Sequence, residues 1–168
     1  MKLRIAATLL AVGLLAACTD DPEPKVEPSE SPTRPTTTSP TRPPEELQPT
    51  GVVRAWIDAQ NEALISGDTA ELRRISDPSC TTCLSGFVDP IEDVYAAGGH
   101  FETDGWRVTA AQSRESSSPT IEVDVGVEIS GGRTYADSEA EPVSYETETR
   151  ILLFKVRDQA VTFVGFVS

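Results

Sequence analysis

The chain has 168 residues and a formal net charge of −13. The 118 residues from Gly51 onward carry 20 acidic and 9 basic side chains, a net charge of −11. That length suffices for one domain with a core and is too short for two. An acidic surface repels phosphate backbones, so the composition argues against nucleic acid as a partner.

The first 18 residues have the pattern of an export signal. Two basic residues precede an apolar run, Ile5 to Leu15, that is too short to cross a bilayer as a helix. The run ends in Leu15-Ala16-Ala17-Cys18, which resembles the lipobox of bacterial lipoproteins. In that family the chain is cut just before the cysteine, and lipid is attached to its sulfur.

The lipobox resemblance implies a signal peptide at 1–17 and a lipidated Cys18. Acyl chains on Cys18 would hold the protein on the extracytoplasmic face of the cell membrane without a spanning helix. The alternative is an ordinary secretory signal, in which Cys18 plays no part.

Residues 18–50 have the composition of a linker. Nine of the 13 prolines lie in this segment, together with Ser, Thr and acidic residues, and large apolar residues are few. Such a segment cannot bury enough surface to offset the chain entropy lost on folding. We therefore expect a disordered or polyproline-II stalk, with a reach of about 100 Å as an upper limit, that joins the lipid to a domain at 51–168.

The first half of this domain has helical spacing of its apolar residues. The pattern predicts one helix over 51–66, a short second helix over 68–75, and a third helical stretch over 80–95. Pro90 lacks an amide hydrogen, so we expect a kink or two short helices within the third stretch. The glycine pair at 98–99 ends the helical half.

The second half alternates apolar and polar residues, as strands do. Strands are expected from Trp106, over 121–129, over 143–156 and over 161–167, with a bend near Ile151 in the third of these. Helices followed by strands predict an α+β fold, in which the N-terminal helices pack on a curved antiparallel sheet of about four strands.

The order of these elements is similar to the cystatin-like folds of the nuclear-transport-factor-2-like superfamily. Four short segments also resemble an uncharacterised actinobacterial lipoprotein family, a domain of unknown function. The resemblance implies a cone-like fold and an extracytoplasmic location, and it assigns no activity. The segments are Val53-Arg54-Ala55-Trp56-Ile57, Ser66-Gly67-Asp68-Thr69, Ser76-Asp77-Pro78-Ser79-Cys80-Thr81-Thr82-Cys83 and Val94-Tyr95-Ala96-Ala97-Gly98-Gly99.

Cys80 and Cys83 form a Cys-x-x-Cys motif. If lipid occupies Cys18, an even pair of cysteines is left in an oxidising compartment, which favours a structural disulfide. The alternative is a redox dithiol, because a cysteine at a helix start can have a lowered thiol pKa. A metal site is not expected, since one such motif and a single histidine leave a zinc tetrahedron incomplete.

Four aromatic residues could line a cone between the helices and the sheet, namely Tyr95, Trp106, Tyr145 and Phe163. In the superfamily that the chain resembles, such a cone can hold a small ligand; the alternative is a filled core. The sequence has no nucleophile elbow, phosphate loop or dinucleotide motif, so we assign no catalytic residue and no cofactor.

The leading functional hypothesis is a non-catalytic, lipid-anchored domain that binds a small apolar ligand or an envelope protein. One alternative is an enzyme of the isomerase or hydratase type, which would use His100 or a buried aspartate together with a tyrosine in the cone. The other is a thiol oxidoreductase that acts through Cys80 and Cys83.

Overall fold

The structure is a computed structural model that describes residues 48–114 and 117–167. The expected signal peptide at 1–17, the lipidation site Cys18 and the linker up to residue 47 lie outside the described residues. Within the described ranges, we find no helix with the length and apolar character needed to cross a membrane.

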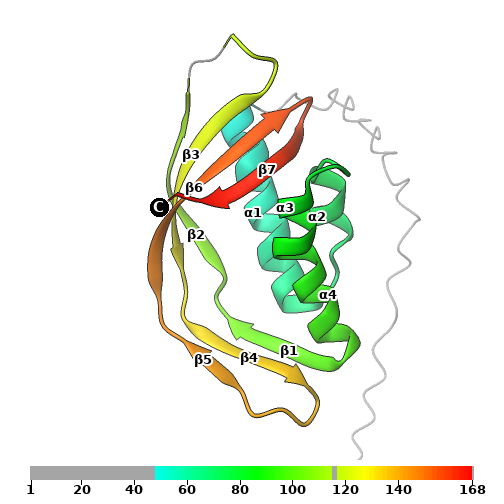
Figure 1. Cartoon of the computed structure of the whole chain (residues 1–168). Helices are drawn as coiled ribbons and strands as arrows, with labels where there is room; N and C mark the ends of the chain where they lie inside the picture. Colours follow the sequence, from blue (N-terminus) through cyan, green and yellow to red (C-terminus); the bar gives the residue numbers. More distant parts are fainter. Residues whose placement is uncertain (1–47, 115–116, 168) are drawn as a thin grey trace, which may run out of the picture. The chain divides into compact units, whose positions relative to one another are not determined.

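A layer of helices comes first in the chain and lies on one side of the sheets (Figure 1). Its longest helix, α1 (Pro49–Ser66), buries an apolar face centred on Trp56. The helix ends at Gly67, which has a φ of 76°, and a Cβ at this position would come within 2.6 Å of the Tyr95 ring. The other elements of the layer are α2 (Ala70–Ile75), α3 (Thr81–Cys83), the π-helical turn η1 (Leu84–Val88) and α4 (Asp89–Ala96).

At Pro90 the helical stretch changes its hydrogen bonding but is not interrupted, so the expected fresh helix start at Asp89 is wrong. The chain passes from η1 directly into α4, and Pro90 falls in the first turn of α4. The Asp89 amide donates to the Leu84 carbonyl, five residues back, so the π-helical turn lies directly before the position where Pro90 lacks an amide hydrogen.

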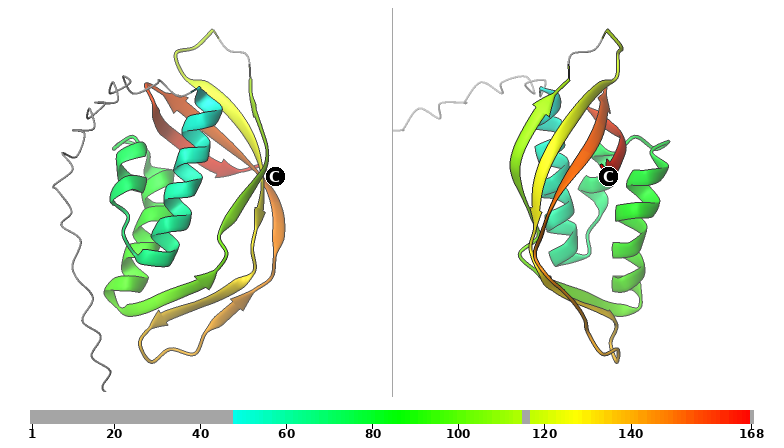
Figure 2. Two further views of the ribbon diagram at one scale, coloured as in Figure 1. Left: turned by 180° about the vertical axis from the view of Figure 1, so that it is seen from behind. Right: turned by 60° about the vertical axis from the view of Figure 1, so that its left-hand side comes forward.

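Seven strands follow in the described part of the chain, and they form two antiparallel sheets. The order is β1-β4-β5 in one sheet and β2-β3-β6-β7 in the other. Both sheets curve around the helical layer (Figures 1 and 2). The α+β class is confirmed, with more strands than the sequence predicted. The strands are β1 (Gly98–Thr103), β2 (Trp106–Ser113), β3 (Ile121–Ile129), β4 (Gly132–Asp137), β5 (Val143–Tyr145), β6 (Glu148–Arg157) and β7 (Ala160–Phe166).

The expected long strand over 143–156 is wrong in one respect, because it is divided between the two sheets as β5 and β6. The expected bend at Ile151 is also absent from β6, whose register is regular there and shifts only between Lys155 and Val156. Ile151 instead points to the outer face of the sheet, where its side chain is 55% exposed. The apolar residues 151–154 thus lie on both faces of β6, with Leu152 and Phe154 buried and Ile151 exposed.

Trp56 is the centre of the core. Its indole is fully buried and makes edge-to-face contacts with Phe87, at 5.2 Å between ring centroids, and with Phe154, at 5.4 Å. Its Nε1 donates a hydrogen bond of 2.9 Å to Ser76 Oγ, which in turn donates to the Leu72 carbonyl at 2.8 Å. One side chain of α1 therefore joins η1, β6 and the end of α2.

An ion pair joins α2 to α4 at the surface of the helical layer. Arg73 donates from Nε and Nη2 to the two carboxylate oxygens of Glu92, at 2.8 and 2.6 Å, and Thr69 Oγ1 donates to the same carboxylate. These hydrogen bonds, those from Arg73 first, lower the pKa of Glu92 from 4.5 to about 2. Both side chains of the ion pair are partly exposed, so solvent weakens its contribution.

The Glu92 pair predicts a loss of stability in acid. A carboxylate with a lowered folded-state pKa contributes fully above its unfolded pKa of 4.5, and this contribution disappears as the pH falls toward about 2. We expect Glu92→Gln to make the free energy of unfolding less dependent on pH between about 6 and 3. Urea unfolding at both pH values measures this, with Glu62→Gln on α1 as the control. Equal acid sensitivity of the wild type and Glu92→Gln would contradict it.

Candidate functional site

An apolar hollow of about 370 Å³ lies between the helical layer and the sheets. Apart from Phe166 on β7, its strand residues lie close to the points where the chain passes from one sheet to the other, between β1 and β2, β3 and β4, and β5 and β6. The volume suits a small molecule. The lining consists of apolar and neutral polar residues: Gln60, Leu64, Gly86, Phe87, Pro90, Ile91, Phe101, Thr103, Trp106, Ile129, Tyr145 and Phe166.

Asn61 holds the corner between β1 and β2 against α1. Its Nδ2 donates to the Trp106 carbonyl at 2.9 Å, and the Trp106 amide donates to its Oδ1 at 2.8 Å. Gly105 is needed beside it, because its φ is 77° and a Cβ would lie 2.5 Å from Asn61 Oδ1. This double hydrogen bond holds the backbone of Trp106 at the hollow. Sequence reasoning missed Asn61; its only signal was a polar residue beside the apolar face of a helix.

A continuous series of aromatic contacts runs from the core to the hollow. Ring centroids are 5.4 Å apart between Phe154 and Trp56, and 5.2 Å apart between Trp56 and Phe87. The series continues from Phe87 to Trp106 at 5.7 Å, and from Trp106 to Phe166 at 6.4 Å. Phe154 is fully buried, whereas Phe166 is 55% exposed. The rings that line the hollow are thus braced by the core, so the wall is formed before a ligand arrives.

The π-helical turn η1 brings two residues to the hollow. Phe87 contributes its ring, and Gly86 leaves room beside it, since a Cβ at this position would meet no heavy atom within 4 Å. π-Helical turns often occur at functional sites. Here the turn lets one segment both complete the core and border the hollow.

Gln60 is a buried polar residue of this lining. The residue is only 4% exposed, and its Oε1 is the one buried side-chain nitrogen or oxygen without a hydrogen bond in the described ranges. An unsatisfied buried acceptor costs about 1–3 kcal/mol. Gln60 borders the hollow through its other atoms, because Oε1 itself has almost no accessible surface.

Two of the four aromatic residues expected at a cone lie in the lining of the hollow, namely Trp106 and Tyr145. Tyr95 lies outside the lining. Its hydroxyl donates to the carbonyls of Leu64 and Ile65, at 2.8 Å each, so it closes the end of α1. Burial raises the pKa of the Tyr95 hydroxyl.

Phe163 also lies outside the lining, and Phe166 occupies the wall in its place. The reason is an irregularity in β7, where Val161 and Phe163 pair with consecutive residues of β6 and Thr162 is the extra residue. The shift reverses the alternation, so Phe163 pairs beside Lys155, whose Nζ lies 5.8 Å from the ring centroid.

His100 lies on β1, and its neighbour Phe101 lines the hollow. Because side chains alternate along a strand, His100 projects from the opposite face. There its ring stacks on Tyr135 at 4.3 Å, and its Nε2 lies 3.8 Å from Glu102 Oε1. A molecule in the hollow is therefore separated from His100 by the strand itself.

Cys80 and Cys83 form a disulfide, and both residues are buried. The segment around them covers the edge of β7: the Asp77 amide donates to the Val161 carbonyl at 2.8 Å, and Thr82 Oγ1 accepts from the Val164 amide at 3.2 Å. An uncovered edge strand invites pairing with other chains. The bridge closes a loop of few residues, worth about 2 kcal/mol in the chain-entropy model. Its placement fits a structural bridge.

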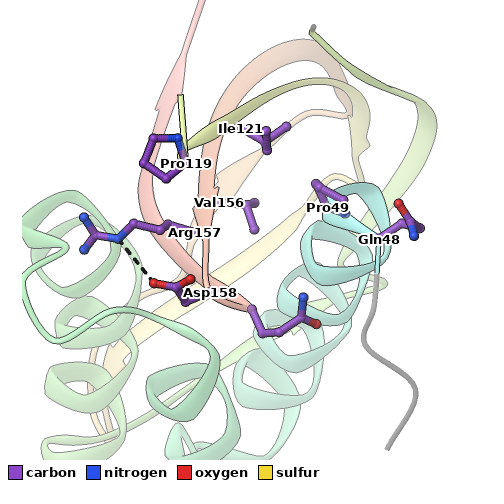
Figure 3. Close-up of a pocket in the computed structure, with 8 residues that line it drawn as sticks. Gln48, Pro49, Pro119, Ile121, Val156, Arg157 and Asp158 are labelled. Carbon is purple, nitrogen blue, oxygen red and sulfur yellow. Dashed lines mark ion pairs between the residues drawn. The ribbon is translucent and has the colours of Figure 1, made fainter. Parts of the chain in front are cut away.

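A smaller recess of about 270 Å³ lies at the N-terminal end of α1 (Figure 3). Gln48 and Pro49 border it on one side, and the turn between β6 and β7 borders it on the other. Its two charged residues, Arg157 and Asp158, form an ion pair of 3.9 Å. This recess lies where the described chain begins, and its charges are already matched.

No protein-family model matches the chain, and neither does any curated protein. Among solved structures, the intermembrane-space region of the chloroplast protein ARC6 is 12% identical, with a TM-score of 0.50 over 70% of this chain and 92% of that one. A putative polyketide cyclase from Pseudomonas putida is 13% identical, with a TM-score of 0.42 over 73% and 92%. An uncharacterised cystatin-fold protein from Novosphingobium aromaticivorans is 10% identical, with a TM-score of 0.41 over 73% and 100%. Such low identities bear on the fold alone.

The unpaired Gln60 oxygen predicts that this residue lowers the stability of the empty protein. Gln60→Met keeps a similar volume and removes the buried acceptor, so we expect the free energy of unfolding to rise by about 1 kcal/mol. Urea unfolding measures the change. Gln112→Met, at an exposed position of β2, is the matched control and should change stability by less than about 0.5 kcal/mol. A loss of stability in Gln60→Met would show that the Gln60 oxygen already has a partner.

Proposed function

We propose that the protein is a lipid-anchored, extracytoplasmic domain whose hollow binds a small, neutral, apolar ligand. The observation that carries the proposal is the hollow itself, an apolar space of about 370 Å³ whose aromatic wall continues into the core. Pockets that bind small molecules are mostly apolar, with a few polar groups that orient the ligand.

Charge supports a neutral ligand. The residues from 51 onward have a net charge of −11, and the lining offers neutral side chains only. A buried ion needs an opposite charge or several hydrogen bonds to offset its lost hydration. The net negative charge of the domain would also repel an anion.

The lipobox resemblance supports a location at the membrane surface. A lipid on Cys18 and the proline-rich segment after it would keep the domain close to the bilayer. Apolar molecules partition into bilayers, so a domain tethered there meets such ligands at a raised local concentration. The lipid anchor would thus bring the hollow to the place where its apolar ligands are most concentrated.

Filling the hollow tests the binding proposal. Gly86→Phe adds a ring at a lining position where a Cβ would meet no heavy atom within 4 Å, and we expect it to weaken binding of the neutral fluorophore N-phenyl-1-naphthylamine by at least about tenfold. Fluorescence titration measures the affinity, and circular dichroism checks the fold. Ile151→Ser, which removes an exposed apolar side chain from the outer face, is the control and should bind as the wild type does. Unchanged binding by Gly86→Phe, or no binding by the wild type, would contradict the proposal.

Replacing the lipobox cysteine tests the location. We expect the wild type to take up labelled palmitate in bacteria and to enter the detergent phase on extraction with Triton X-114, because acyl chains confer membrane affinity. Cys18→Ser should take up no palmitate and remain in the aqueous phase once the signal is removed. A wild type that takes up no palmitate would favour the ordinary secretory signal.

A further inference from the structure

We infer that Gly86 determines the size of ligand that the hollow accepts, because the side chain that it lacks leaves a gap in the rim. A ligand with two ring-sized parts can keep one part inside the hollow and pass the other over this gap. The inference rests on the proposed function, since it concerns the ligand of the same hollow. It goes further by naming the residue that sets ligand size and the class of molecule that fits, an elongated apolar body.

The fold gives no reason for a glycine at position 86. From residue 67 to residue 165, every other glycine has a positive φ or would bring a Cβ within 3.0 Å of another heavy atom. Gly86 has neither feature, because its φ lies outside the left-handed region and a Cβ would meet no heavy atom within 4 Å. In a helical segment, glycine lowers the folding equilibrium constant about 2- to 5-fold relative to alanine. The glycine thus costs stability and solves no packing or backbone problem.

Gly86 lies on the face of the helical layer that borders the hollow. The segment from η1 into α4 contributes Gly86, Phe87, Pro90 and Ile91 to the lining. Residues four apart lie on the same face of a helix, so Gly86 shares a row with Pro90, and Phe87 shares the neighbouring row with Ile91. Ile91 is 3% exposed, whereas Gly86 and Pro90 are exposed residues. A side chain at position 86 would therefore extend the outer row, at the rim of the hollow.

The other exposed residues of the rim all carry rings. Four residues of the lining are exposed, and three of them are Pro90, Tyr145 and Phe166. Tyr145 belongs to β5 and Phe166 to β7, so the helical layer and both sheets contribute to the rim. The fourth is Gly86, which has no side chain. An apolar group that extends beyond the hollow therefore finds the most room over Gly86.

A matched pair of probes tests the inference. N-phenyl-1-naphthylamine has two ring systems, and 1-naphthylamine keeps the naphthalene and the nitrogen but lacks the phenyl ring. We use the full chain that follows the predicted signal peptide, with Cys18→Ser so that no attached lipid competes. Isothermal titration calorimetry measures both affinities for this protein, for Gly86→Ala and for Gly86→Leu. Ser85→Leu is the matched control, because Ser85 is exposed, directly precedes Gly86 and lies outside the lining.

We expect Gly86→Leu to weaken binding of N-phenyl-1-naphthylamine by at least about tenfold, and that of 1-naphthylamine by less than about threefold. Gly86→Ala should bind the larger probe with an intermediate affinity, and it carries the test if Gly86→Leu does not fold. Urea unfolding should show that Gly86→Ala raises the folding equilibrium constant about 2- to 5-fold. Ser85→Leu should keep both affinities.

Equal losses of affinity for the two probes in Gly86→Leu, or no loss for either, would overturn the inference. So would a loss of stability in Gly86→Ala, because the fold itself would then require the glycine. Phe166→Ala, which removes another ring of the rim, separates these results from a failure of the proposed function. Weaker binding of both probes by Phe166→Ala supports their place in the hollow. If the protein with Gly86 binds neither probe, or if Phe166→Ala changes neither affinity, the proposed function itself fails.

Discussion

The two hydrogen bonds between the Asn61 side chain and the backbone of Trp106 determine how the rest of the structure is arranged around the hollow. They join the last third of α1 to the corner where the chain leaves one sheet and enters the other. N-terminal to this point, α1 packs on the sheet through Trp56, and the space is filled. Near the corner the two sheets separate, and the hollow occupies the space between them and the helices. Asn61 therefore lies at the boundary between the filled core around Trp56 and the hollow.

Two adjacent polar residues of α1 differ in how well their side chains are hydrogen-bonded. Asn61 satisfies both of its polar groups within the protein, whereas the neighbouring Gln60 leaves a buried oxygen without a partner. Proteins tolerate such a local cost when the rest of the fold is stable enough to offset it. Here the core around Trp56 supplies that stability, and its aromatic contacts also support the wall of the hollow.

The helical half and the class of the fold could be predicted from local patterns. The 3.6-residue spacing identified α1, and strict alternation identified β3. Pro90 marked the place where the third helical stretch changes its hydrogen bonding. The aromatic lining could be predicted only in part. An extra residue at Thr162 reversed the alternation of β7 and exchanged Phe163 for Phe166. Asn61 and Gln60 were missed because their roles arise from contacts between distant segments, and no short motif marks them.

Intermolecular nuclear Overhauser effects test the central claim most directly, because they locate a bound apolar molecule by its protein neighbours. The account predicts effects between N-phenyl-1-naphthylamine and the ring protons of Phe87, Trp106 and Phe166, the rings that face the hollow. The outer face of the four-stranded sheet also exposes apolar side chains, among them Ile151. Effects to Ile151, with none to the three rings, would contradict the account and place the binding surface on the other side of the sheet.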